Sequence, residues 1–266
     1  MWWTYGGYAD VSTKKPWERD TVVNVFSTSK LVTNLAALML ISRGVLHPDD
    51  KVAQHWPEFA ANGKSEVTVS QVLTHTAGIC AWQDNMMLED VCDIEAATDK
   101  LANQATLWAP GTAMGYHGIT QGFLIGELVA LGSVNGHTNA RALVKILSCF
   151  SLSGTCAGGG YRLLSAETVK LVLTEHAIGT DVVTGRSGRR GLGIYLTGPG
   201  SGIVEGKLPE GSVGWGSGWG GSIVVVDSDR RLTLAYAMNR MLSEEHPSPA
   251  AFIKAVYEIL GVTIAA

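Results

Sequence analysis

Apolar residues recur at helical spacing from Ser27 onward and predict the first long helix of the chain. Leucines stand three or four positions apart at Leu31, Leu35 and Leu38, which places them on one helical face. Gly44 follows, where a left-handed glycine commonly ends a helix. The segment ahead of Ser27 alternates apolar and polar residues around a Lys-Lys-Pro turn, which predicts short strands. A strand-rich segment therefore leads directly into a buried helix.

The middle of the chain is predicted to be mainly helical and the C-terminal third mainly strand. Helical spacing and start signals predict helices over residues 69–74, 92–104, 120–131, 139–150 and 165–175. Glycine accumulates over residues 185–221, and two apolar runs at 222–227 and 232–238 then predict a hairpin. A last helix is predicted to start with Ser248 as its cap and Pro249 at its first position.

Strands at both ends of the chain around a helical middle predict the fold class. We expect an α/β (α+β) protein with an antiparallel sheet built from both chain ends and flanked by helices, and with a mainly helical second lobe. The 266 residues suffice for one such domain. Its sheet subdomain is expected over residues 1–45 and 186–266, and its helical subdomain over residues 46–185. Clefts between such lobes often hold active sites.

Composition and charge narrow the class of partner. Charged residues make up 17% of the chain and the formal net charge is −4, so no charge excess favours nucleic acid or an anionic membrane. The four cysteines form no CxxC pair and have no histidine spacing typical of zinc, so no metal is expected, and disulfides are possible but not implied. The apolar run at 35–41 is too short to span a membrane, and residues 1–5 lack a signal-peptide pattern, so we expect a cytoplasmic protein.

The sharpest chemical signal is an S-x-x-K motif at Ser27 and Lys30, at the start of the predicted helix. Residues three apart share one helical face, so the Lys30 side chain can reach the Ser27 hydroxyl. The unpaired N–H groups at a helix N-terminus favour a developing alkoxide or oxyanion. S-x-x-K is also the motif of β-lactamases and penicillin-binding proteins. Ser27 is therefore the candidate nucleophile and Lys30 its partner.

Two further segments follow the S-x-x-K motif. A P-G-T segment at residues 110–112 precedes Tyr116, which is either a catalytic phenol or a buried tyrosine whose hydroxyl caps the next helix. Residues 214–222 read G-W-G-S-G-W-G-G-S and precede a predicted strand. A dinucleotide fingerprint would instead follow a strand and open a helix, so no nucleotide cofactor is expected from the G-x-G-x-x-G spacing in this segment.

Together these motifs resemble the serine β-lactamase-like and penicillin-binding-protein-like family, in particular class C β-lactamase-related esterases and transesterases of the family VIII carboxylesterase type, in a shortened form. The resemblance implies Ser27 as the nucleophile, Lys30 as its partner and Tyr116 as the general base. A cation beside a phenol lowers its pKa, which such a base requires at neutral pH. His75, in an L-T-H-x-A-G segment, matches a structural histidine of the family.

The resemblance also implies residues that bind the substrate. The backbone N–H groups of Ser27 and Trp219 correspond to the oxyanion hole. The remaining substrate contacts are expected from four residues of the glycine-rich segment, Trp215, Gly216, Ser217 and Gly218.

The sequence departs from the family pattern at several positions. The Lys or His of the family's third motif falls on Gly216, and the Asn expected two positions after the tyrosine is replaced by Gly118. The stretch between the second and third motifs is short, and residues 136–139 look like the site of an internal loss. Arg189 and Arg190 form a basic pair that we expect in a solvated turn.

The expected function is that of a serine hydrolase acting on a small-molecule ester or related acyl substrate through an acyl-serine intermediate. Water as acceptor gives a carboxylesterase, and an alcohol gives an acyltransferase or transesterase. β-Lactam hydrolysis is disfavoured because the third-motif cation is missing. No cofactor is expected, and the oligomeric state is not indicated. The alternative is a catalytically inactive β-lactamase-like relative that serves as a binding protein, or a truncated relative.

Overall fold

The structure, a computed structural model, describes residues 3–129, 136–201, 204, 206–241 and 247–264. Its helices are α1 Ser29–Ser42, α2 Val52–His55, α3 Val69–Leu73, α4 Leu88–Cys92, α5 Ile94–Asn103, α6 Thr120–Val129, α7 Ala140–Ser151, α8 Ala166–Val172 and α9 Pro247–Ile259, with 3-10 turns at Phe26–Thr28 and Pro57–Gly63. Its strands are β1 Tyr8–Asp10, β2 Lys15–Pro16, β3 Val23–Asn24, β4 His137–Thr138, β5 Ala177–Thr180, β6 Ser187–Gly191, β7 Ile194–Leu196, β8 Val213–Ser217, β9 Ile223–Asp227 and β10 Leu232–Tyr236.

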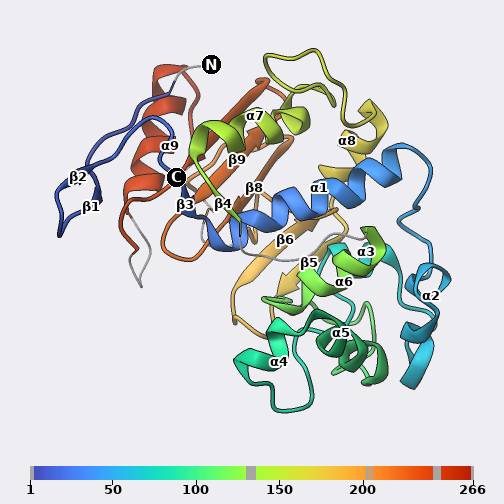
Figure 1. The fold of residues 1–266 in the computed structure, drawn as a ribbon. Helices are drawn as coiled ribbons and strands as arrows, with labels where there is room; N and C mark the ends of the chain where they lie inside the picture. Colours follow the sequence, from blue (N-terminus) through green and yellow to red (C-terminus); the bar gives the residue numbers. More distant parts are fainter. Residues whose placement is uncertain (1–2, 130–135, 202–203, 205, 242–246, 265–266) are drawn as a thin grey trace.

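A six-stranded antiparallel sheet in the order β10-β9-β8-β7-β6-β5 forms the centre of the fold (Figure 1). The expected fold class is confirmed, including the hairpin of β9 and β10. One detail of the expectation was wrong, because the N-terminal strands that the structure describes do not join this sheet. β1 pairs with β2, and β3 pairs with β4. These strands are only two or three residues long, and Pro16 has no N–H to offer a ladder.

Both faces of the large sheet are covered, which explains why β9 is an unbroken apolar run. Its five residues are all buried. Val224 and Val226 point into a core shared with α1, α7 and α8, whereas Val225 points into a second core. Ile253 of α9 belongs to that second core. Side chains alternate between the two faces of a strand, so a strand covered on both faces needs apolar residues at every position.

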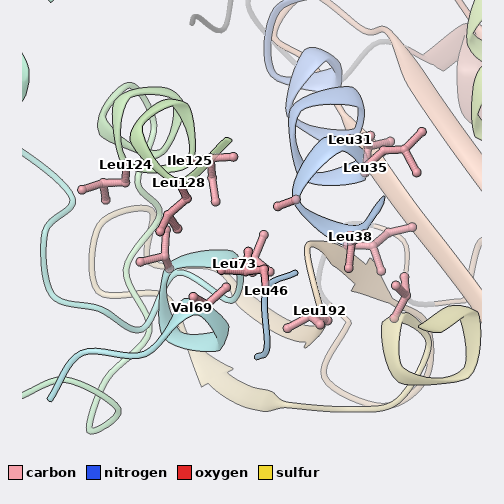
Figure 2. Packing of buried hydrophobic residues seen from close by; sticks show 14 of the residues in the cluster. Leu31, Leu35, Leu38, Leu46, Val69, Leu73, Leu124, Ile125, Leu128 and Leu192 are labelled. Carbon is pink, nitrogen blue, oxygen red and sulfur yellow. The ribbon is translucent and has the colours of Figure 1, made fainter. Parts of the chain in front are cut away.

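Helix α1 is the centre of the larger core. Leu31, Leu35 and Leu38 are buried along one face, as the leucine spacing predicts (Figure 2). They pack between the sheet and the α3 and α6 residues of the helical lobe. Gly44 lies just beyond the helix with a φ of 69°, which confirms the predicted left-handed glycine. The first helix therefore connects the two parts of the fold and holds its N-terminus, with Ser27 and Lys30, at their boundary.

The predicted helices agree with the structure except at their ends. The helix expected over 92–104 is divided, because the Asp93 side chain accepts a hydrogen bond from the Ala96 N–H at 3.1 Å and caps α5. The last helix begins at Pro247, ahead of the predicted Ser248 cap. Leu131, the predicted end of the sixth helix, lies outside the described residues.

The proposed division at residues 46–185 remains a prediction. Figure 1 shows α2 to α6 gathered on one side of α1. However, α7 packs against β9 and β10, and β5 is the edge strand of the large sheet. Both elements come from the range expected to form the helical subdomain, so this range also contributes to the sheet layer.

Replacement of Leu38 by alanine tests the central role of α1. The side chain is fully buried in the larger core. Leu38→Ala is expected to lower the free energy of unfolding by about 2–5 kcal/mol, through lost apolar burial and the cavity left behind. Val32→Ala, at an exposed position of the same helix, should change it by less than about 0.5 kcal/mol. Urea denaturation followed by circular dichroism measures both, and equal effects would contradict this assignment.

Candidate active site

Ser27 lies in a strained turn that leads from β3 into α1. Phe26 adopts a positive φ of 46°, and its N–H donates to the Asn24 side chain at 2.8 Å. Ser222, just before β9, holds this turn from the other side: its hydroxyl donates to the Val25 carbonyl at 2.8 Å. Left-handed backbone at a non-glycine residue costs free energy and often occurs at functional sites. The surrounding hydrogen bonds thus hold Phe26 in an unusual conformation directly before the serine.

Lys30 is buried one turn further along, with 6% of its surface exposed. Its Nζ donates to the Gly118 carbonyl at 2.7 Å and lies 5.3 Å from the centre of the Tyr116 ring. Burial lowers the pKa of the Lys30 amine to about 8, because desolvation disfavours the ammonium form. Gly118 replaces the asparagine expected there, and its backbone carbonyl supplies the lysine with an acceptor.

Tyr116 lies beside Ser27 and Lys30. Tyr116 and Ser27 line the same two cavities, and the Tyr116 N–H donates to Asp181 Oδ1 at 3.1 Å. Burial raises the pKa of the Tyr116 phenol to about 12, although the Ser27 side chain and the charge of Arg190 act in the opposite direction. The expected lowering of this pKa is therefore not found, because desolvation outweighs the nearby cations. Of the two groups, the Lys30 amine has the pKa nearer to neutrality.

His75 and His117 support the loop that carries Tyr116. The His117 N–H donates to His75 Nδ1 at 3.1 Å. The His117 ring accepts the Ile79 N–H at Nε2 and contacts the Gly115 carbonyl through Nδ1 at 2.6 Å. Burial lowers the pKa of His117 to about 4 and that of His75 well below its usual value, so both rings are neutral at physiological pH. Their contacts fit the structural role expected for His75.

A cavity of about 400 Å³ opens above the nucleophile. It brings together six of the predicted site residues, Ser27, Tyr116, Trp215, Ser217, Gly218 and Trp219. Lys30 and Gly216 do not line it. They line a second cavity of about 30 Å³, together with Ser27 and Tyr116. A Cβ atom at Gly216 would lie 2.9 Å from the Leu31 side chain, so this position faces α1 and has no room for a lysine or histidine.

The predicted oxyanion hole remains a prediction. Ser27 and Trp219 both line the larger cavity, and the rings of Phe26 and Trp219 meet edge to face at 6.0 Å. In the part of the chain that the structure describes, no acceptor is hydrogen-bonded to the Trp219 N–H. A free donor at this point is what an oxyanion hole requires.

Sequence reasoning missed Asp181 and misplaced Arg190. Arg190 is 3% exposed and forms a 3.0 Å ion pair with Asp181, and both residues line the larger cavity. The expectation that Arg189 and Arg190 occupy a solvated turn was wrong, since both lie in β6. Successive residues of a strand point to opposite faces, so only Arg189 reaches the surface, where it pairs with Glu175. The alternation along β6 was the signal that could have separated the two arginines.

The segment expected to mark an internal loss lies beside the nucleophile. Gly136 accepts a hydrogen bond from the Val25 N–H at 3.1 Å and donates to the Ser29 hydroxyl at 3.0 Å. β4, at His137–Thr138, pairs with β3. Both contacts hold the turn that presents Ser27, so this short connection contributes directly to the site.

Within the described ranges, no group of three or more His, Cys, Asp and Glu side chains could hold a metal ion. No helix in the same ranges has the length and apolar character needed to cross a membrane.

The chain belongs to the Beta-lactamase family, whose profile matches residues 1–131 and 130–258. It is 34% identical over 125 residues to the esterase/beta-lactamase LipL of Mycobacterium tuberculosis, and this match covers 46% of the chain and 28% of LipL. It is 30% identical over 128 residues to the esterase EstB of Burkholderia gladioli, covering 41% of the chain and 32% of EstB. The matches thus span about a third or less of these curated relatives.

Solved structures match the fold over most of its length. A family VIII carboxylesterase superposes with a TM-score of 0.87 at 27% identity, covering 95% of this chain and 87% of that one. A penicillin-binding protein homologue from Caulobacter crescentus gives the same TM-score, identity and coverage. The family and the fold class expected from the motifs are therefore confirmed.

The pKa of Lys30 predicts how the reactivity of Ser27 depends on pH. Burial lowers this pKa to about 8, so the amine is neutral above that pH and gains a proton below it. The rate at which a fluorophosphonate labels Ser27 should therefore fall about tenfold for each pH unit below 8 and level off above it. The measurement is the labelling rate between pH 6 and 9, with Ser27→Ala as the unlabelled control. A rate independent of pH over this range would contradict a neutral Lys30 as the proton acceptor.

Proposed function

We propose that this chain is a serine hydrolase that cleaves small-molecule esters through an acyl-serine intermediate. The observation that carries the proposal is the meeting of Ser27, Tyr116 and the buried Lys30 around one small cavity, with Ser27 and Tyr116 also lining the cavity of about 400 Å³. A nucleophile, a proton acceptor and space for a substrate are the parts that acyl transfer needs. The homology to proteins named as esterases supports the same class.

The first half of the reaction forms the acyl-enzyme. The Ser27 oxygen attacks the ester carbonyl carbon while its proton passes to the phenol oxygen of Tyr116, and the Tyr116 proton passes to the neutral amine of Lys30. The N–H groups of Ser27 and Trp219 stabilise the oxyanion in this proposal. The tetrahedral intermediate then loses its alkoxide, which takes a proton back through Tyr116. Lys30 thus ends the step neutral.

The second half of the reaction releases the acyl group. Water attacks the acyl-serine carbon, gives its proton through Tyr116 to Lys30, and yields a carboxylic acid. An alcohol in the same place yields a new ester, which is the acyltransferase outcome. The structure of EstCE1, described as a hydrolase with promiscuous acyltransferase activity, shares the fold at a TM-score of 0.74. Both acceptors fit the mechanism because either can deliver a proton to Tyr116.

The substrate class is a neutral ester in preference to a β-lactam carboxylate. Position 216, which the resemblance assigns to a carboxylate-recognising cation, holds glycine and faces Leu31. The walls of the cavity include the aromatic rings of Tyr195 and Trp215, which stack at 4.7 Å. An apolar acyl group gains more from such walls than a charged one does.

Hydrolysis of p-nitrophenyl butyrate tests the proposal. Ser27→Ala should lower kcat by at least about a thousandfold, because it removes the hydroxyl that forms the acyl-enzyme in this proposal. The matched control Ser12→Ala, in an exposed turn between β1 and β2, should leave kcat unchanged. Equal rates for a folded parent and Ser27→Ala, with no fluorophosphonate labelling of the parent, would overturn the enzyme assignment and leave the inactive relative as the reading.

A further inference from the structure

Three side chains from neighbouring strands form a row across the sheet. Arg190 of β6 is the register partner of Tyr195 of β7, and Tyr195 is the register partner of Trp215 of β8. Directly paired residues point to the same face of a sheet. All three line the 400 Å³ cavity, and Tyr116 lines it too. The row therefore runs from the aromatic wall of the cavity towards the candidate catalytic phenol.

Arg190 has a defined contact in each direction. Its guanidinium carbon lies 4.0 Å from the centre of the Tyr195 ring and 6.0 Å from that of Tyr116. Its Nε contacts Met114 Sδ at 3.0 Å and its Nη2 donates to Asp181 Oδ2 at 3.0 Å. A planar cation near aromatic rings gains from them, and its hydrogen bond to a carboxylate restricts its orientation.

Asp181 links Arg190 to the backbone of the loop that carries Tyr116. Its Oδ1 accepts the N–H of Tyr116 at 3.1 Å, and those of Val183 and Thr184 at 3.0 Å each. Its Oδ2 accepts from Arg190. The Asp181 carboxylate thus binds both the backbone of Tyr116 and the guanidinium of Arg190. These two hydrogen bonds keep Arg190 close to Tyr116.

Burying an arginine is costly unless its charge is used or compensated. Asp181 compensates it, but two apolar side chains of similar volume would stabilise this position as well. Arg190 thus supplies a cation near Tyr116, whereas Gly216 has no side chain that could do so. The charge of Arg190 favours release of the phenol proton, as a nearby positive charge does for any phenol.

We propose that Arg190 is a positioning residue for Tyr116: held by Asp181, it fixes the Tyr116 ring and promotes proton transfer from Ser27. This inference rests on the proposed function. Arg190 acts through Tyr116 and forms no bond to the reacting atoms. The other titratable groups around Tyr116 are Lys30 of α1, His75 after α3, His117 of the same loop, Asp181 after β5 and Tyr195 of β7.

Chemical rescue separates the charge of Arg190 from its shape. Arg190→Ala should lower the fluorophosphonate labelling rate of Ser27 about tenfold at pH 7, because the phenol loses the positive charge that favours release of its proton. Added guanidinium chloride, below the concentration that unfolds the protein, should restore the rate with saturation. Urea has the same planar shape without the charge and should not. Arg189→Ala, the neighbouring arginine on the other face of β6, is the matched control and should label like the parent.

Arg190→Lys is the second variant, because Arg190→Ala leaves Asp181 without its partner and can fail to fold. It keeps a positive charge and should label within about threefold of the parent. Folded Arg190→Ala with an unchanged rate, rescue by urea as well as by guanidinium, or folded Arg190→Lys slowed more than tenfold would each overturn the proposal. A parent that is neither labelled nor active on esters overturns the proposed function, and this inference with it, whereas a labelled parent confines any failure to Arg190.

Discussion

Burial of Lys30 at the start of α1 is the constraint on which the chemistry of the site depends. The amine is nearly without solvent, and its Nζ has the Gly118 carbonyl as acceptor. Desolvation lowers its pKa to about 8, and the same dry environment raises the pKa of the Tyr116 phenol to about 12. Burial therefore brings the pKa of the lysine closer to neutrality and moves that of the tyrosine further from it, which fits the proposed roles of proton acceptor and relay. A more open site would return both groups to their ordinary values and lose this division of roles.

The dry environment results from the packing of the whole chain around α1. The leucine face of this helix joins the sheet to the helical lobe, and the strained turn at Phe26 ends where the helix begins. The backbone at Gly218 lies so close to the Val25 carbonyl that a Cβ atom at this position would collide with it. This close contact helps to exclude water from the site. The site is thus assembled from the start of α1, the loop that carries Tyr116 and strand β8, which are distant in sequence and meet through the core.

The departures from the family pattern have compensating contacts in the fold. Gly118 offers its carbonyl to Lys30 where an asparagine was expected. The short connection at Gly136 supports the turn of the nucleophile. Gly216 packs against Leu31 and carries no charge. The nearby cation is Arg190 on β6, which lies close to the Tyr116 ring. A chain that matches a third or less of its curated relatives nevertheless encloses the serine, lysine and tyrosine in one described site.

The sequence by itself determined the local features: the long helix that begins just after Ser27 and carries Lys30, the hairpin of β9 and β10, and the family. These follow from spacing within one element, and spacing is a property of the chain alone. The tertiary structure decided the rest. The raised pKa of Tyr116, the orientation of Gly216 and the pairing of Arg190 with Asp181 depend on which distant residues exclude water from a group and which face of a strand is covered. Desolvation and register are set by packing, which short-range patterns do not encode.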